Sequence, residues 1–191
     1  MAYATYITEA LVCGTFNRNT ADRSYLLFTR EAGMIYADAR SVREERSKQR
    51  YALQDFSLVR VSLVKGKRTW RIGSIESNDN FYHQAESKQA RGSVVSVFRL
   101  LRRFLKGEEA SDELFDFVVD GLKVLKTGDS NQFVAEVVQL RIMAYLGYVD
   151  DRQIPDQVRK TNPGELLKYD NKEISVVVDK LYVQAVESSH L

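Results

Sequence analysis

The sequence predicts an α+β protein in which a small β-barrel precedes an all-helical domain. Five short runs rich in β-branched and aromatic residues lie within roughly the first 77 residues, which is typical of a closed or nearly closed barrel. Beyond Phe81, apolar residues instead recur at three-and-four spacing, the period of amphipathic helices. The pattern changes between Asn78 and Phe81, so we expect domains of residues 1–79 and 80–191.

The expected strands are marked by alternation and by turn residues. Val59, Val61 and Leu63 alternate with polar residues, as a half-buried strand requires. Gly33 separates two neighbouring runs and is able to take the positive φ that a short hairpin connection needs. The runs are residues 3–16, 24–29, 34–39, 56–63 and 69–77.

The expected helices have apolar stripes and terminal signals. Gly107 ends the first helix, Ser111 caps the second, and Gly147 caps the C-terminus of the third. Asn162 followed by Pro163 predicts another helix start. The valine-rich last run keeps the helical period, so we favour helix over strand there. The three longer segments that follow the first helix are residues 111–125, 132–146 and 174–186.

Composition limits the possible chemistry. One cysteine and two histidines allow no internal disulfide and supply too few ligands for a structural zinc site. No signal peptide is visible, and no apolar run is long enough to span a membrane. We therefore expect a cytoplasmic protein that does not associate with a membrane. No catalytic motif is present, and His83 and His190 are more typical of surface residues than of general bases. We therefore expect no enzyme activity, no cofactor and no metal.

Charge is divided unevenly along the chain. Residues 1–72 carry 13 Lys and Arg against 7 Asp and Glu, a net of +6. The remaining 119 residues carry 15 against 19, a net of −4. This asymmetry indicates an anionic partner for the first half, although a solvated basic surface is the simpler alternative.

The basic residues are concentrated in two segments. The first follows the expected hairpin and has few apolar anchors, so we expect a flexible cationic arm whose side chains lie along a phosphate backbone. Asp38, Glu44 and Glu45 dilute its charge. Candidate nucleic-acid contacts are Arg40, Arg43, Arg46, Lys48 and Arg50 in this segment, and Lys65, Lys67, Arg68 and Arg71 around a second basic turn. The nearby aromatic residues that are candidates for stacking with bases are Tyr25, Tyr36, Tyr51 and Phe56.

The order of several short motifs resembles the RecO family of bacterial DNA repair proteins. FTREAGMI at residues 28–35 is followed by ADAR at 37–40, RSK at 46–48 and LQDF at 53–56. QLRIMAYLGY at residues 139–148 is similar to the family's helix that ends in Leu-Gly-Tyr. The resemblance therefore touches both expected domains in the same order.

This resemblance implies an OB-fold barrel joined to a helical domain, without an enzymatic reaction. It implies binding of single- and double-stranded DNA, annealing of complementary strands, and loading of RecA, with the partner RecR, onto strands coated by single-stranded DNA-binding protein. Motif matching carries over only Arg40, Arg46 and Lys48 as DNA contacts. Asp38 and Asp55 depart from the family's glycine and proline, and residues 149–160 lack the four zinc cysteines of many members, so no zinc is expected.

Two other functions remain open from the sequence. The helical domain would serve as an interaction module if its basic residues hold the acidic tail of a single-stranded DNA-binding protein. The alternative reading of these residues is a solvated helix face. An RNA-binding OB-fold protein of translation is the third possibility. The candidate partner-binding residues are Arg99, Arg102, Arg103, Lys106, Lys123 and Arg141.

Overall fold

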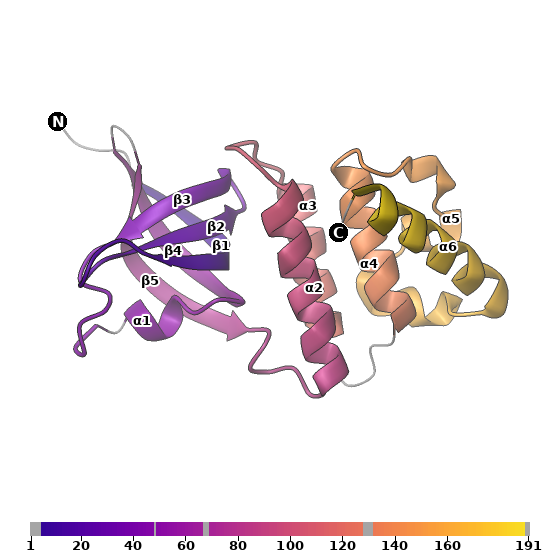
Figure 1. Ribbon diagram of the computed structural model, residues 1–191, viewed down its shortest axis with the longest axis horizontal. Coiled ribbons are helices and arrows are strands. Elements are labelled where there is room, and N and C mark those ends of the chain that lie inside the picture. The colour runs from indigo at the N-terminus through magenta and orange to yellow at the C-terminus, as the bar shows by residue number, and fades with distance from the viewer. Residues whose placement is uncertain (1–4, 48, 67–68, 128–131, 190–191) are drawn as a thin grey trace. The chain divides into compact units, whose positions relative to one another are not determined.

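The N-terminal part of the protein is a closed five-stranded barrel in the computed structural model, which describes residues 5–47, 49–66, 69–127 and 132–189. The strands follow the order β1-β2-β3-β5-β4, with β1 antiparallel to both β2 and β4 and with β3 parallel to β5 (Figure 1). This arrangement confirms the OB-fold expectation. The strands are β1 (Thr5–Asn17), β2 (Arg23–Thr29), β3 (Gly33–Ala39), β4 (Ser57–Lys65) and β5 (Trp70–Asn80).

A bulge in β1 decides which side chains face the barrel interior. Ala10 and Val12 point into the core, but the register of β1 with β2 shifts between Val12 and Gly14. After the shift, Thr15 pairs with the buried core residue Tyr25, so the next residue, Phe16, points outward. An uninterrupted two-residue period would have placed Phe16 in the barrel with Ala10 and Val12.

The β2-β3 hairpin turns at Gly33 as expected, with φ of 64°. The Thr29 hydroxyl donates to the Gly33 carbonyl at 2.9 Å, which fixes the turn. The next amide, of Met34, donates to the Gly107 carbonyl at 2.9 Å. The loop that contains Gly107 therefore packs on the closed end of this hairpin.

The basic segment after β3 is a loop held against the barrel, so the expectation of a flexible arm with few apolar anchors was wrong. Val42 is fully buried within the barrel core. The Arg43 amide donates to the Ala21 carbonyl at 3.1 Å, and Ser41 takes a positive φ of 50°. A short helix that was not expected, α1 (Gln49–Ala52), follows and lies against β5 (Figure 1). One valine in a polar run has no periodicity, which is why the sequence did not reveal this anchor.

The helical part is arranged around α4 (Gln132–Tyr145). Phe133, Val137 and Leu140, which have the helical spacing of an inward face, are buried. Glu136 and Gln139 on the other sides of α4 are also buried, because α6 and the 3-10 helices pack on it as well. Gly147 has φ of 80°, and the amides of Gly147 and Tyr148 donate to carbonyls of α4, which confirms the expected C-cap. The other elements are α2 (Lys88–Phe104), α3 (Asp112–Leu125), η1 (Asp151–Gln153), α5 (Asp156–Arg159), η2 (Pro163–Tyr169) and α6 (Lys172–Ser189).

Two expectations about helices in the C-terminal part of the chain had different outcomes. The valine-rich C-terminal run is helical in α6, as its period predicted. Asn162 does precede a helical segment, but that segment is the 3-10 helix η2, and the Asn162 side chain makes no capping hydrogen bond. Pro163 at the first position is compatible with either helix type, so the motif located the start but not the kind of helix.

The chain forms two compact units, and their boundaries differ from a single cut at residue 79. The first unit comprises Met1–Gln84 together with Leu101–Asp112, and the second comprises Ala85–Leu100 with Glu113–Leu191. The segment Leu101–Asp112 belongs to the barrel unit because its loop bonds to the hairpin and to Lys65 at the end of β4. Such long-range bonds leave no signal in a local sequence pattern.

Candidate nucleic-acid interface

Two large aromatic side chains meet on the outer surface of the barrel. Phe16 on β1 and Tyr36 on β3 lie diagonally across β2, with ring centroids 5.9 Å apart and planes inclined by 54°. Their exposed fractions are 46% and 57%. Gly14 lies beside the Phe16 ring, since a β-carbon there would be in van der Waals contact with the ring at 3.4 Å. The pair is thus an exposed aromatic surface on an OB-fold.

Arginines lie next to this aromatic pair at the end of β3. Asp38 follows Tyr36 on the same outer face, is the register partner of Arg71 on β5, and forms an ion pair with Arg18. Arg40, two residues after Asp38, is exposed. Arg18 and Arg71, from separate parts of the sequence, therefore lie next to Asp38, and Arg40 adds a third positive charge at the end of β3.

A second carboxylate, that of Asp22, also lies close to these arginines. The pKa of Asp22 lies below its usual value, mainly because its carboxylate accepts hydrogen bonds from the Asn19 side chain and the Ser41 amide. The positive charges of Arg40 and Arg18 also lower this pKa. Arg18 and Arg40 are thus within electrostatic reach of one group, as expected for a basic patch.

A residue of α2 extends this surface. A β-carbon at Gly14 would lie 3.8 Å from Cδ of Arg102 and 3.4 Å from the Phe16 ring, so both side chains are neighbours of Gly14. We predicted a partner-binding role for Arg102, which stays a prediction, and the structure places its side chain next to Gly14 of the same unit. We call Phe16, Arg18, Tyr36, Arg40, Arg71 and Arg102 the aromatic-arginine face.

The other candidate DNA contacts have separate environments. Arg43 and Arg46 are exposed on the loop after β3, where an Arg43 guanidinium nitrogen donates to the Asn19 carbonyl at 2.7 Å. Arg50 lies over the ring of the neighbouring Tyr51, with its central carbon 4.8 Å from the centroid. The candidates Lys48, Lys67 and Arg68 lie outside the residues that the structure describes.

Lys65 is engaged within the barrel unit. Its Nζ lies 2.7 Å from Glu108 and 4.9 Å from the centre of the Trp70 ring. Glu108 also accepts a hydrogen bond from Trp70 Nε1 at 3.1 Å. The bonds from Lys65 and then Trp70 hold the pKa of Glu108 below its usual value. A phosphate would have to compete with this carboxylate for Lys65.

The aromatic candidates divide into exposed and internal residues. Tyr36 and Tyr51 are exposed at 57% and 63%, so bases have access to them. Tyr25 is fully buried in the barrel core, where it serves packing. Phe56 stacks on Tyr82 with centroids 5.2 Å apart. Sequence reasoning missed Phe16 and Arg18, since only the bulge in β1 turns Phe16 outward.

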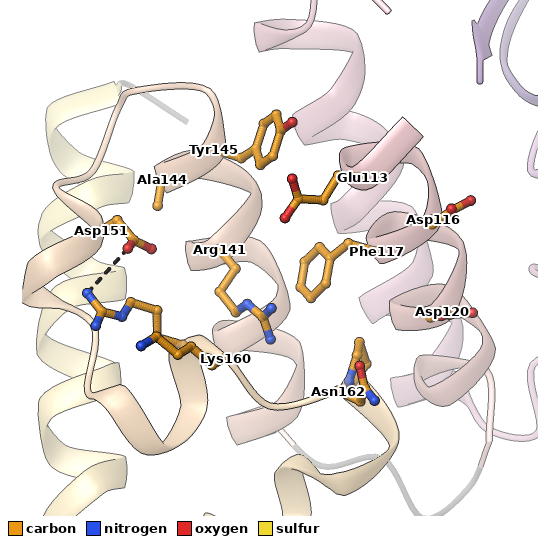
Figure 2. Close-up of a pocket in the computed structure, with 12 residues that line it drawn as sticks. Glu113, Asp116, Phe117, Asp120, Arg141, Ala144, Tyr145, Asp151, Lys160 and Asn162 are labelled. Atoms are coloured by element: carbon orange, nitrogen blue, oxygen red, sulfur yellow. Dashed lines mark hydrogen bonds and ion pairs between the residues drawn. The ribbon is translucent and has the colours of Figure 1, made fainter. Parts of the chain in front are cut away.

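The helical unit has a pocket of about 860 Å³ beside Arg141 (Figure 2). The Arg141 guanidinium lies 4.1 Å from the Phe117 ring centre and donates to the carbonyls of Val158 and Thr161. Burial lowers its pKa. These internal bonds tie Arg141 to the segment before η2, whereas the other candidate partner residues are exposed: Arg99, Arg103, Lys106 and Lys123.

Metal-ligating side chains do not gather in the part of the chain that is described. There, no three His, Cys, Asp or Glu side chains come together as a possible metal site. Within the same residues, no helix has both the length and the hydropathy needed to cross a bilayer.

The fold and the aromatic-arginine face define the class of this protein, namely OB-fold proteins with a second, helical part. Residues 1–81 match the family model described as "Recombination protein O N terminal", and residues 92–149 match "Recombination protein O C terminal". The chain therefore belongs to the RecO family, as its motifs suggested.

Curated relatives carry the name DNA repair protein RecO. The chain is 29% identical to that of Pelotomaculum thermopropionicum over 75% of this chain and 56% of the relative, and 29% identical to that of Desulfitobacterium hafniense over 75% and 52%. It is 25% identical to that of Myxococcus xanthus over 96% and 75%. The chain spans about half the length of the first two relatives.

Proposed function

We propose that this protein is a non-enzymatic mediator of DNA repair and recombination that acts in the cytoplasm. In this proposal it binds single- and double-stranded DNA, anneals complementary strands, and with RecR helps to load RecA. Family membership and the relatives' name, DNA repair protein, support the repair role.

The aromatic-arginine face is the single observation that carries the DNA-binding part. Phe16 and Tyr36 expose about half of their surface, although large apolar side chains are normally buried. Bases of a single strand stack on such rings regardless of sequence, and nearby guanidinium groups neutralise the phosphates. Arg71 lies on β5 opposite Asp38 of β3, and Arg40 directly follows the end of β3, so one strand of DNA would reach both rings and arginines.

Single-stranded DNA fits this face better than a duplex. Stacking needs a base whose flat surface is free, which a paired and stacked base does not offer. A duplex would contact mainly the arginines through its phosphates, without sequence readout. A protein that holds a single strand by its backbone and by a few stacked bases leaves other base edges available for pairing, which is compatible with annealing.

Salt-dependent binding tests this proposal. Replacing Arg40 and Arg71 together by alanine should weaken binding of oligothymidylate and reduce the slope of log affinity against log salt by roughly 1 to 1.5 units, since each single-strand phosphate contact contributes roughly 0.7. The matched control replaces the exposed Lys172 and Lys180 of α6, which removes the same charge elsewhere. Equal slopes for wild type and the Arg40/Arg71 variant would refute the role of this face, and tighter binding of RNA than of DNA would favour the translation alternative.

We also propose that the basic residues of α2 and the following loop bind the acidic tail of single-stranded DNA-binding protein. Arg99, Arg103 and Lys106 are exposed, so an acidic peptide has access to them. Anisotropy of a labelled acidic peptide should show binding that weakens when these three residues become alanine. A strand-annealing assay on DNA coated with the binding protein would then test the complete activity. Unchanged peptide affinity in the triple variant would mean that these basic residues form only a solvated helix surface.

A further inference from the structure

A second, hollow surface opens at the end of the barrel next to the aromatic-arginine face. It is a pocket of about 590 Å³. It is lined by the end of β1, the start of β2, α1 and the loop that follows α1. Thr15 and Arg23 line one side, while Arg50 and Tyr51 line the other. None of these four is used by the aromatic-arginine face.

The basic side of this pocket is organised around a stacked pair. The Arg50 guanidinium carbon lies 4.8 Å from the Tyr51 ring centre, and an Arg50 nitrogen donates to the Tyr51 hydroxyl at 2.7 Å. The Tyr51 ring is nevertheless 63% exposed. A guanidinium held beside an accessible ring offers a phosphate contact and a stacking surface within one nucleotide's length. Arg23 supplies a second guanidinium to the same pocket.

The pocket also contains groups that accept hydrogen bonds. Asp55 Oδ1 accepts a hydrogen bond from the Thr15 hydroxyl at 2.6 Å, which fixes the orientation of the carboxylate. The neighbouring Gln54 amide also lines the pocket. A carboxylate repels phosphate but accepts hydrogen bonds from the amino and imino groups at the edge of a base. The pocket thus contains guanidinium groups for a phosphate, together with a ring and hydrogen-bond acceptors for a base.

The pocket lies at the same end of β1 as Phe16 of the aromatic-arginine face. Phe16 points outward, whereas its neighbour Thr15 lines the pocket and is the register partner of the core residue Tyr25. A strand stacked on Phe16 would therefore reach the pocket rim within one residue of β1. This arrangement suggests that both surfaces serve the same ligand.

We infer that this pocket holds one nucleotide of single-stranded DNA, with its phosphate against Arg23 and Arg50 and its base on Tyr51. The inference rests on the proposed DNA-binding function and adds a subsite to it. The nucleotide is either a phosphorylated strand end or an internal nucleotide, because both present a base and a phosphate.

Photocrosslinking combined with binding measurements tests this subsite. Oligothymidylates carry 5-iododeoxyuridine at the 5′ end, the middle or the 3′ end, each with a 5′-phosphate or a 5′-hydroxyl. The variants are Tyr51→Ala, Tyr51→Phe and Arg50→Ala, with Tyr148→Ala as a control at a tyrosine of similar exposure that does not line the pocket. Thermal unfolding verifies that each variant folds.

We expect a crosslink to Tyr51, and we expect Tyr51→Ala to weaken binding roughly fivefold or more, since stacking on one aromatic ring contributes about that much. Tyr51→Phe should retain most of the affinity, and Tyr148→Ala all of it. A preference for the 5′-phosphate that disappears in Arg50→Ala identifies a strand end, and crosslinking from the middle position identifies an internal nucleotide.

Other outcomes separate this inference from the proposed function. If Tyr51→Ala and Arg50→Ala bind like wild type while the Arg40/Arg71 variant loses affinity, the pocket is not a nucleotide subsite and the DNA-binding proposal stands. If the wild-type protein binds no DNA, both are wrong.

Discussion

Phe16 and Tyr36 form a contact on the outside of the barrel, with ring centroids 5.9 Å apart, although a complete strand, β2, separates their own strands. The bulge in β1 makes this contact possible, because it turns Phe16 outward. About half of each ring remains exposed, so their contribution to folding is limited. A function in binding gives a reason for two exposed aromatics that stability alone does not.

Removing both rings should separate binding from stability. In the Phe16→Ala/Tyr36→Ala variant we expect single-stranded DNA affinity to fall at least tenfold, because stacking contributes about 1–3 kcal/mol per base. The free energy of unfolding should change by no more than about 1 kcal/mol, as the rings are half exposed. Fluorescence anisotropy and urea denaturation measure the two effects. Replacing Tyr145 and Tyr148, which are similarly exposed, is the control, and a DNA affinity equal to that of wild type would contradict the role of the rings.

The hairpin turn should not accept a side chain at Gly33. Gly33 has φ of 64°, and a β-carbon there would lie 2.5 Å from the Glu109 carbonyl oxygen. We expect Gly33→Ala to lower the free energy of unfolding by at least about 1–3 kcal/mol, the typical cost of this backbone conformation before the clash is added. Gly92→Ala is the matched control. It lies in α2 with nothing within 4 Å, so it should stabilise the protein by about 0.5–1 kcal/mol. Equal denaturation midpoints for the two variants would contradict this prediction, because they would show that the turn accommodates a side chain in place of Gly33.

The contact between Glu108 and Trp70 should make tryptophan fluorescence sensitive to acid. Hydrogen bonds to the carboxylate lower the pKa of Glu108 from its ordinary 4.5, so this stabilisation is complete above pH 4.5 and is lost as pH falls through the lowered pKa. The Glu108 side chain is 51% exposed, which limits the contribution to below about 1 kcal/mol. Since Trp70 is the only tryptophan, its emission should change in that acid range.

Two variants assign this acid transition. Glu108→Gln should abolish it, whereas Glu109→Gln, at the adjacent exposed residue, should leave it intact. A transition of the same size and midpoint in Glu108→Gln would mean that another group titrates near Trp70.

Local sequence patterns predicted most helices and strands, but they did not predict which residues form the aromatic-arginine face. Alternation in β4, the glycine turn and the helical period of α6 are short-range signals, and the structure agrees with them. The orientation of Phe16 depends on a one-residue bulge, which reverses the inward and outward positions without changing the residue types. Arg102 reaches the face only because its segment packs with the barrel, far from Phe16 in the sequence.

Burial of single residues was equally difficult to predict. Val42 lies among charged residues in the sequence, yet it enters the barrel core. Arg141 looked like any other basic residue, but its partners Val158 and Thr161 lie 17 and 20 residues away. In both cases the tertiary partner, and not the local pattern, decides the role of the side chain.

Arg141 should therefore contribute mainly to stability. Its guanidinium donates to the carbonyls of Val158 and Thr161 and lies over Phe117. Arg141→Met keeps an apolar side chain against the ring but leaves both carbonyls without this donor, so we expect unfolding free energy to fall by about 2–3 kcal/mol. Arg141→Lys should recover only part of the loss, because an ammonium lacks the planar fork of donors. The exposed Lys123→Met is the control and should change stability by less than about 0.5 kcal/mol.

Hydrogen exchange and peptide binding distinguish a structural role of Arg141 from partner binding. If Arg141 holds the segment that contains Val158 and Thr161, amides of that segment should exchange faster in Arg141→Met than in wild type. Acidic-peptide affinity, compared under conditions where both proteins are folded, should be nearly unchanged because the guanidinium is engaged inside the domain. If instead stability and exchange equal those of wild type and peptide affinity falls, Arg141 belongs to the partner-binding surface.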